Sequence, residues 1–230
     1  NLVQYVSGTN SPGNRVGKDR FYTKEKIPAY ASSFLITGLV SADYVDRTGD
    51  GITDDDQGDA VKFGYTKLYG DQDPYRWRTP YGPSDATYQE GLRTDNSDDK
   101  GSYIYGTKEI WYLNSIMTKT MIATFTLNDT AKGELRQDGY GVKDEDGGID
   151  TTHGLRYLKE INLYSKADYL NFMKTGKKPR PVKTVHFVYG YTLCPGAPGS
   201  RNGNGKLTLD SIWFSYNGNE KGHQNPYVFR

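Results

Sequence analysis

An acidic loop, DRTGDGITDDD at residues 46–56, holds the side chains best suited to binding a metal ion. Calcium takes six to eight hard oxygen ligands, arranged in its binding loops at alternate positions around a glycine. With Asp46 as position 1, Gly51 falls at position 6, where it permits the sharp turn such loops need. The spacing therefore predicts a calcium site formed by Asp46, Thr48, Asp50, the Ile52 carbonyl and Asp54.

An EF-hand is excluded, because Gln57 stands where the bidentate glutamate belongs and no helical pattern flanks the loop. Loops of the FG-GAP or thrombospondin type remain, with Asp55, Asp56 or Asp59 as closing ligands. The alternative is a solvated acidic turn. Six aspartates between residues 46 and 59 face a single arginine and repel one another, which favours the calcium hypothesis.

A second acidic stretch, DEDGGID at residues 144–150, places Asp144, Asp146 and Asp150 at similar spacing. Val142 occupies position 1, so this loop lacks its first ligand. A solvated Asp/Gly turn is the interpretation that follows.

An aromatic stretch, YRWRTPYGPSDATY at residues 75–88, offers rings that can stack on a sugar, with arginines and an aspartate to bind its hydroxyls. The candidate carbohydrate-binding residues are Tyr75, Trp77, Tyr81 and Tyr88. Packing of an irregular segment onto a β-sheet core explains the same aromatics and is favoured.

Signs of catalysis are few. The sequence has no G-x-S-x-G, H-E-x-x-H or C-x-x-C motif, and His186 alternates with Val185 and Phe187 as a residue on one strand face. Carboxylates are so numerous that no particular pair indicates a glycoside hydrolase. The chain is therefore predicted to be non-enzymatic, with a hydrolase as the least favoured alternative.

Composition indicates the fold class. Twenty tyrosines and 27 glycines in 230 residues favour an all-β protein of antiparallel hairpins with long loops. One short helix is expected near residues 166–174, between Ser165 as N-cap and Gly176. A net charge of +1 argues against a nucleic-acid partner, and no apolar run is long enough for membrane insertion.

An internal similarity divides the chain into a loop-rich β region with the acidic loop, residues 1–102, and a repeated hairpin region, residues 103–230, in one continuous module. A Leu-x-x-Ile pattern occurs three times, at Leu113/Ile116, Leu158/Ile161 and Leu209/Ile212. Each copy is followed by a β-like run with a phenylalanine: Phe125, Phe187 and Phe229. Each unit is predicted to be an antiparallel strand pair.

These repeats, with FVYGY at residues 187–191 as the clearest case, resemble those of large bacterial RHS/YD-repeat proteins and the related SpvB-like and toxin-complex B shells. GDGITDDD resembles the calcium loop of the FG-GAP repeats often found in such shells. The resemblance implies a structural segment of a large secreted or cell-surface bacterial protein, stabilised by calcium. Its partners would be the remainder of its own longer chain, and surface glycans or other cell-surface proteins.

Overall fold

The computed structural model describes residues 2–4, 24–83, 85–88, 101–128, 138–177, 179–196 and 205–229. The all-β prediction is confirmed: the described chain is built of antiparallel strands with one α-helix and one short 3-10 helix.

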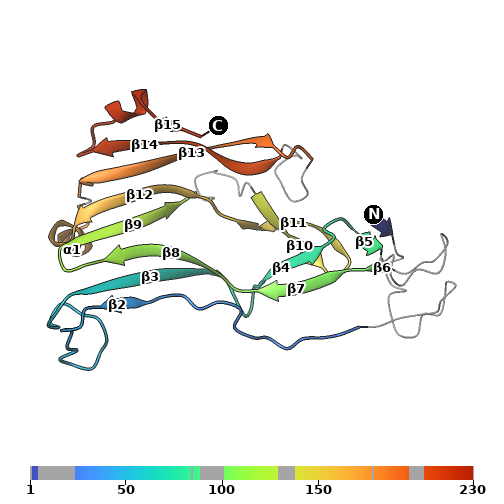
Figure 1. Ribbon diagram of the computed structural model, residues 1–230, viewed down its shortest axis with the longest axis horizontal. Coiled ribbons are helices and arrows are strands. Elements are labelled where there is room, and N and C mark those ends of the chain that lie inside the picture. Colours follow the sequence, from blue (N-terminus) through green and yellow to red (C-terminus); the bar gives the residue numbers. More distant parts are fainter. Residues whose placement is uncertain are drawn as a thin grey trace.

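Eight strands form one antiparallel sheet in the order β15-β14-β13-β12-β9-β8-β3-β2, seen face-on in Figure 1. Their bounds are β2 Gly38–Val40, β3 Ala60–Tyr69, β8 Ile110–Met117, β9 Met121–Leu127, β12 Leu158–Ser165, β13 Lys183–Leu193, β14 Lys206–Tyr216 and β15 Tyr227–Val228. The strand before the acidic loop, β2, is short, since only residues 38–40 pair with β3.

Three smaller sheets lie beyond one end of the large one (Figure 1): β4 with β7, β10 with β11, and β1-β5-β6. Their bounds are β1 Leu2–Gln4, β4 Tyr75–Thr79, β5 Asp85–Tyr88, β6 Gly101–Ser102, β7 Ile104–Lys108, β10 Asp138–Asp144 and β11 Gly147–Leu155. β4 packs on both β10 and β11. The apolar core is therefore small, with Val142, Tyr69 and Tyr75 buried where these strands meet.

The helix α1, Lys166–Thr175, matches the predicted 166–174. Gly176 ends it in the left-handed conformation and donates its N–H to the Phe172 carbonyl at 2.7 Å, as a C-terminal glycine does. Ser165 is the N-cap, but its side chain makes no capping hydrogen bond. The 3-10 helix η4, Lys221–Gln224, packs on β14.

Each Leu-x-x-Ile copy lies on a strand that carries a β-bulge inside the motif. In the first copy, the consecutive residues Gly64 and Tyr65 of β3 pair with Ser115 and Leu113 of β8. Asn114, which lies between these two partners, is therefore the extra residue. The register shifts in the same way on the other two copies, leaving Lys159 and Asp210 as the extra residues. In all three copies the residue after the leucine is the bulge.

The bulge explains the spacing of three. Side chains on a regular strand alternate between faces, so residues three apart would point to opposite sides. One extra residue restores the phase and places the leucine and the isoleucine on the same face.

Each motif isoleucine is paired with a phenylalanine of the preceding strand in the sheet: Phe63 with Ile116, Phe125 with Ile161, and Phe187 with Ile212. The three phenylalanines are evenly spaced, because 125 − 63 and 187 − 125 are both 62. The predicted antiparallel strand pairs are therefore present. Each motif isoleucine, however, lies opposite the phenylalanine that precedes it in the chain, not the one that follows it. The expected third phenylalanine, Phe229, follows β15 and lies outside this series, and Phe63 begins it.

The bulge can be tested by deleting Asp210, which would move one half of the Leu209/Ile212 motif to the opposite face. We expect the deletion to lower the free energy of unfolding by about 3 kcal/mol or more, the range for disrupting packed apolar side chains. Asp210→Ala keeps the extra residue and should change stability by less than about 0.5 kcal/mol. Urea unfolding of both variants measures the difference, and equal losses would refute the role assigned to the bulge.

Candidate functional sites

The acidic loop is organised by two aspartates that accept hydrogen bonds from the loop backbone. Asp46 Oδ1 accepts from the N–H groups of Thr48 and Gly49, and its Oδ2 accepts from Gly51. Gly49 and Gly51 both have positive φ, which lets the chain turn around the carboxylate. Asp46 thus occupies the centre of the first half of the loop.

Asp56 holds the second half. It is only 7% exposed and accepts hydrogen bonds from the N–H groups of Arg47 and Thr53 and from the Tyr44 hydroxyl, at 3.1, 2.8 and 2.7 Å. The bonds from the Thr53 N–H and Tyr44, with a further one from Arg47, lower the pKa of Asp56 to about 2. The hydrogen bond between Tyr44 and Asp56 also raises the pKa of the Tyr44 hydroxyl to about 12. The sequence suggested Asp56 only as a closing ligand, and its structural role is tying the loop together.

Two of the five predicted calcium ligands bind lysines. Lys62 Nζ donates to the Ile52 carbonyl at 3.0 Å, and Lys166 Nζ, at the start of α1, forms an ion pair with Asp54. Thr48 donates to Asp50 at 2.7 Å. Among the described residues, no three His, Cys, Asp or Glu side chains form a group that could hold a metal ion. The oxygen chemistry of the loop suits calcium, but its described arrangement does not gather the predicted ligands, so calcium binding stays a prediction.

The 144–150 stretch forms the hairpin between β10 and β11, where Asp144 pairs with Gly147. Asp144 accepts the N–H of Asp146 at 2.9 Å, whereas Asp150 bonds to Thr152 and His153. The separate partners of these aspartates agree with a turn rather than a cage.

His153 lies between two carboxylates. Its Nδ1 is 2.5 Å from Asp150 Oδ2 and its Nε2 is 2.5 Å from Asp73 Oδ1, which ties β11 to the turn before β4. Burial raises the pKa of Asp150, but hydrogen bonds from Thr152 and His153 outweigh it, and the net effect is to lower that pKa. Both ring nitrogens of His153 contact carboxylates, so the histidine links β11 to the turn before β4 and stabilises the smaller sheets.

The aromatic stretch contributes to packing. Tyr75 is 6% exposed and donates its hydroxyl to the Gly139 carbonyl at 2.7 Å, while Tyr81 donates to Gly141 at 3.2 Å. The Trp77 indole lies against Gly106 of β7, where an added Cβ would come within 2.9 Å. The Tyr88 side chain lies outside the described part of the chain. A sugar needs an open ring face, and the burial of Tyr75 leaves the packing interpretation favoured.

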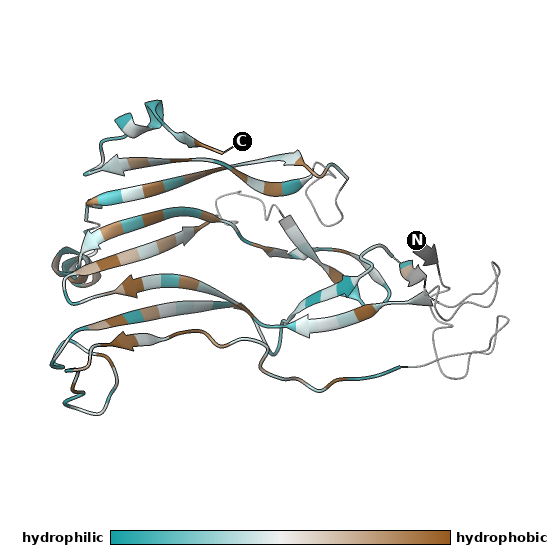
Figure 2. Cartoon of the chain, in the orientation of Figure 1, coloured by the Kyte–Doolittle hydropathy of each residue, from teal (hydrophilic) through white to brown (hydrophobic). Residues whose placement is uncertain are grey.

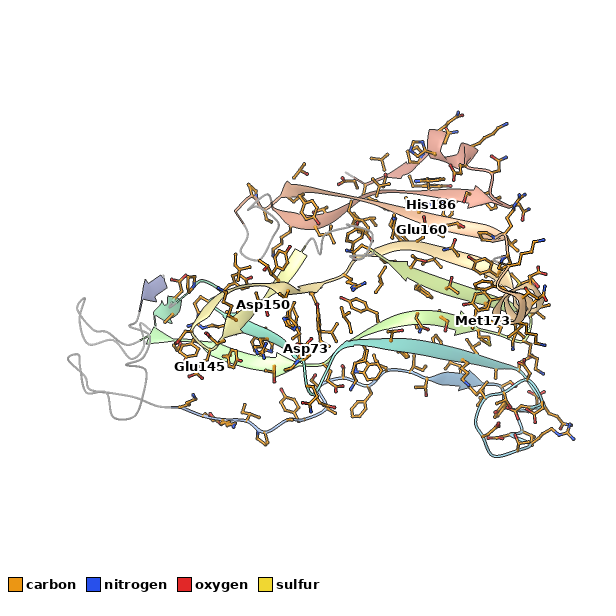
Figure 3. All side chains as sticks on the ribbon, turned by 180° about the vertical axis from the view of Figure 1, so that it is seen from behind. Asp73, Glu145, Asp150, Glu160, Met173 and His186 are labelled. Carbon is orange, nitrogen blue, oxygen red and sulfur yellow. The ribbon has the colours of Figure 1, made fainter. Side chains whose placement is uncertain are left out.

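Three adjacent strands align a carboxylate, a histidine and a serine that the sequence motifs did not reveal. Glu160 of β12 lies with its Oε1 3.3 Å from His186 Nδ1, and His186 Nε2 is 3.0 Å from Ser215 Oγ. Glu160 and His186 are labelled side by side in Figure 3. The only sequence signal was the position of His186 in a strand, because the partners come from strands 26 and 29 residues away.

The order of these groups matches a nucleophile, a base and an orienting acid. Two features oppose catalysis. Ser215 is only 6% exposed, and the His186 ring is stacked on Trp213 with centroids 3.7 Å apart. A shallow groove of about 500 Å³ lies elsewhere, between β2, β3 and the 118–120 turn. The arrangement fits a hydrogen-bonded line of side chains within the sheet.

Chelation tests the calcium prediction. If the loop binds calcium, a hundredfold excess over the dissociation constant should stabilise the fold by about 2.7 kcal/mol through linkage, seen as a higher melting temperature than with chelator. Asp50→Ala should abolish the gain and Asp144→Ala should preserve it. Calcium would also compete with Lys166 for Asp54, so Lys166→Met should tighten binding. Identical melting curves with calcium and chelator would leave the loop a solvated turn.

The pKa of Asp56 predicts a pH dependence. Its folded pKa of about 2 lies below the ordinary value of about 3.9, so the ionised carboxylate stabilises the fold above about pH 4. This contribution is lost as the pH falls from about 4 to 2. Asp56→Asn should lower the melting temperature at pH 7, and the gap to the unmodified chain should narrow toward pH 2. Asp55→Asn, at an exposed neighbour, is the control; a gap independent of pH would contradict the assignment.

No protein-family model, curated protein sequence or solved structure matches this chain. Within the described residues, no helix is long and apolar enough to span a membrane.

Proposed function

We propose that this chain is a non-enzymatic structural segment of a large secreted or cell-surface bacterial protein. The observation that carries the proposal is the repeated bulged strand pair, with Phe63, Phe125 and Phe187 at equal spacing. Repetition of one supersecondary unit extends a sheet by adding neighbours, as scaffolds do. The groups that resemble catalytic machinery support the same conclusion, because Ser215 is enclosed and His153 is held at both nitrogens.

Calcium at the acidic loop is part of the same proposal. Asp46, Thr48, Asp50, Asp54 and the Ile52 carbonyl would hold the ion. The loop joins β2 and β3 and is linked to α1 through Lys166 and Asp54, so an ion there would strengthen one corner of the sheet.

The alternative of a carbohydrate-binding module has weaker support, because Tyr75 is buried and Tyr81 has its hydroxyl bonded. Trp77→Ala would abolish glycan-array binding if the module bound sugars. If the unmodified chain bound specific glycans and Trp77→Ala did not, the carbohydrate-binding alternative would be favoured over the structural proposal.

Location and size of the native protein test the leading proposal. An antibody raised against the recombinant chain should detect, in the bacterium that encodes it, a polypeptide several times larger than 25.8 kDa. The signal should be in the secreted or surface fraction and should be lost when intact cells are treated with protease. A cytoplasmic band that protease does not reach would overturn the proposal.

A fluorophosphonate probe tests the absence of serine hydrolase activity. We expect no labelling, because Ser215 is enclosed on the sheet. Ser215→Ala is the matched control. Labelling of the unmodified chain that this variant loses would establish Ser215 as a nucleophile and favour the hydrolase alternative.

A further inference from the structure

The two faces of the eight-stranded sheet differ in chemistry. Directly paired residues of neighbouring strands lie on the same face, so the register assigns each side chain to a side. One face, here called the polar face, carries Ser115, Thr124, Thr126, Glu160, Asn162, Thr184, His186, Trp213 and Ser215. The other, the apolar face, carries all three motif repeats.

The apolar face consists of three equivalent quartets. Each contains the paired phenylalanine and isoleucine together with the motif leucine and its partner. The quartets are Phe63/Ile116 with Tyr65/Leu113, Phe125/Ile161 with Leu127/Leu158, and Phe187/Ile212 with Tyr189/Leu209. Because the three units are adjacent in the sheet, the quartets form one continuous apolar surface. Figure 2 shows the alternation of apolar and polar residues along these strands.

The apolar face is no more buried than the polar face, on which Ser115, Thr124, Glu160, His186 and Trp213 are of intermediate exposure and Thr126 is exposed. On the polar face, Asn162, Thr184 and Ser215 are 8%, 3% and 6% exposed. None of the twelve quartet side chains is buried; all are of intermediate exposure. A soluble sheet normally covers its apolar side and leaves its polar side to water.

The packed helices lie on the polar face. The Tyr169 ring of α1 contacts the Tyr164 ring at a tilt, with centroids 5.6 Å apart, and Tyr164 lies on the polar face with its partner Ile122. His223 of η4 meets Trp213 edge-on at 5.2 Å. In the described part of the chain, no other helix or sheet packs substantially on β8, β9, β12, β13 or β14.

We propose that the apolar face is the interface of a homodimer, in which two copies of this chain pack sheet against sheet. Two sheets that pack face to face lie about 10 Å apart with their strands about 30° from parallel. This arrangement places quartets against quartets across a two-fold axis. The proposal is independent of the proposed function, because a scaffold segment can be monomeric or dimeric.

The area suits a stable interface. Six strands about 4.8 Å apart, each with three side chains spread over about 20 Å, cover roughly 600 Å² per copy, or about 1,200 Å² in a dimer, the lower end of the range for specific interfaces. Leu39 of β2 and Tyr227 of β15 extend the same face, since they pair with Val61 and Ile212.

The charge of the face also suits a second copy. The two lysines on the apolar face, Lys67 and Lys183, lie at its opposite edges. Lys67 pairs with Glu109 at 2.7 Å, and Lys183 lies over the Phe214 ring at 4.3 Å. A surface with both its lysines accommodated within the chain offers no charge pattern for an acidic or basic partner. A partner equally apolar and flat fits it, and a second copy is such a partner.

Oligomeric state tests the proposal directly. Light scattering at tens of micromolar should give twice the mass of the 230-residue chain. Phe125→Lys, on the apolar face, should shift the mass to that of one chain. Thr126→Lys, at the neighbouring exposed position on the polar face, should remain dimeric. Circular dichroism checks that both variants keep their strands.

A crosslink tests the same face without a disruptive charge. In a Cys194→Ser background, Val185→Cys on the apolar face should form an intermolecular disulfide on oxidation, whereas Thr126→Cys, at an exposed position on the polar face, should not. A monomeric unmodified chain would overturn the dimer and leave the face to another segment or protein. Assemblies larger than two, or equal crosslinking from both faces, would also overturn it.

Discussion

The period-two alternation of side chains along a strand is the constraint on which the rest of the structure depends. The chain repeats an apolar pair at a spacing of three, which a regular strand would divide between two faces. A single extra residue in each copy reconciles the two periods. Because the bulge occurs at the same place in all three copies, every apolar quartet reaches the same side of the sheet. Without the bulges, each strand would present a mixture of polar and apolar groups to both faces.

Gathering apolar groups on one side leaves the other side to hydrogen bonding. Short polar side chains form a row across the middle strands, with Thr184 donating to Asn162 at 2.8 Å and Ser215 next to His186. The larger side chains lie in the neighbouring rows of the same face: Tyr164 on one side of this polar row, and His186 and Trp213 on the other. Buried polar groups are stable when they are paired, so this row can be enclosed although it is polar. The Glu160, His186 and Ser215 arrangement belongs to the same pattern.

The ends of the large sheet are held by local charge and turn chemistry. At one corner, Asp46 and Asp56 accept hydrogen bonds from the acidic loop, while Lys62 and Lys166 tie that loop to β3 and α1. At the opposite end, the bridge through His153 and the buried Tyr75 connect the smaller sheets. The described part of the chain is therefore a broad sheet held at its two ends by these contacts, with a small apolar core.

The sequence by itself determined the β class, the α-helix near residue 166, the turn chemistry of the acidic loop and the recurrence of Leu-x-x-Ile. These features are local, because propensity, glycine placement and spacing act over a few residues. Only the tertiary structure decided that Phe63 begins the series, that the bulge follows each leucine, and that Glu160, His186 and Ser215 align. The physical reason is register: which residues of two strands face each other depends on pairing across tens of residues, and one extra residue reverses every side chain beyond it.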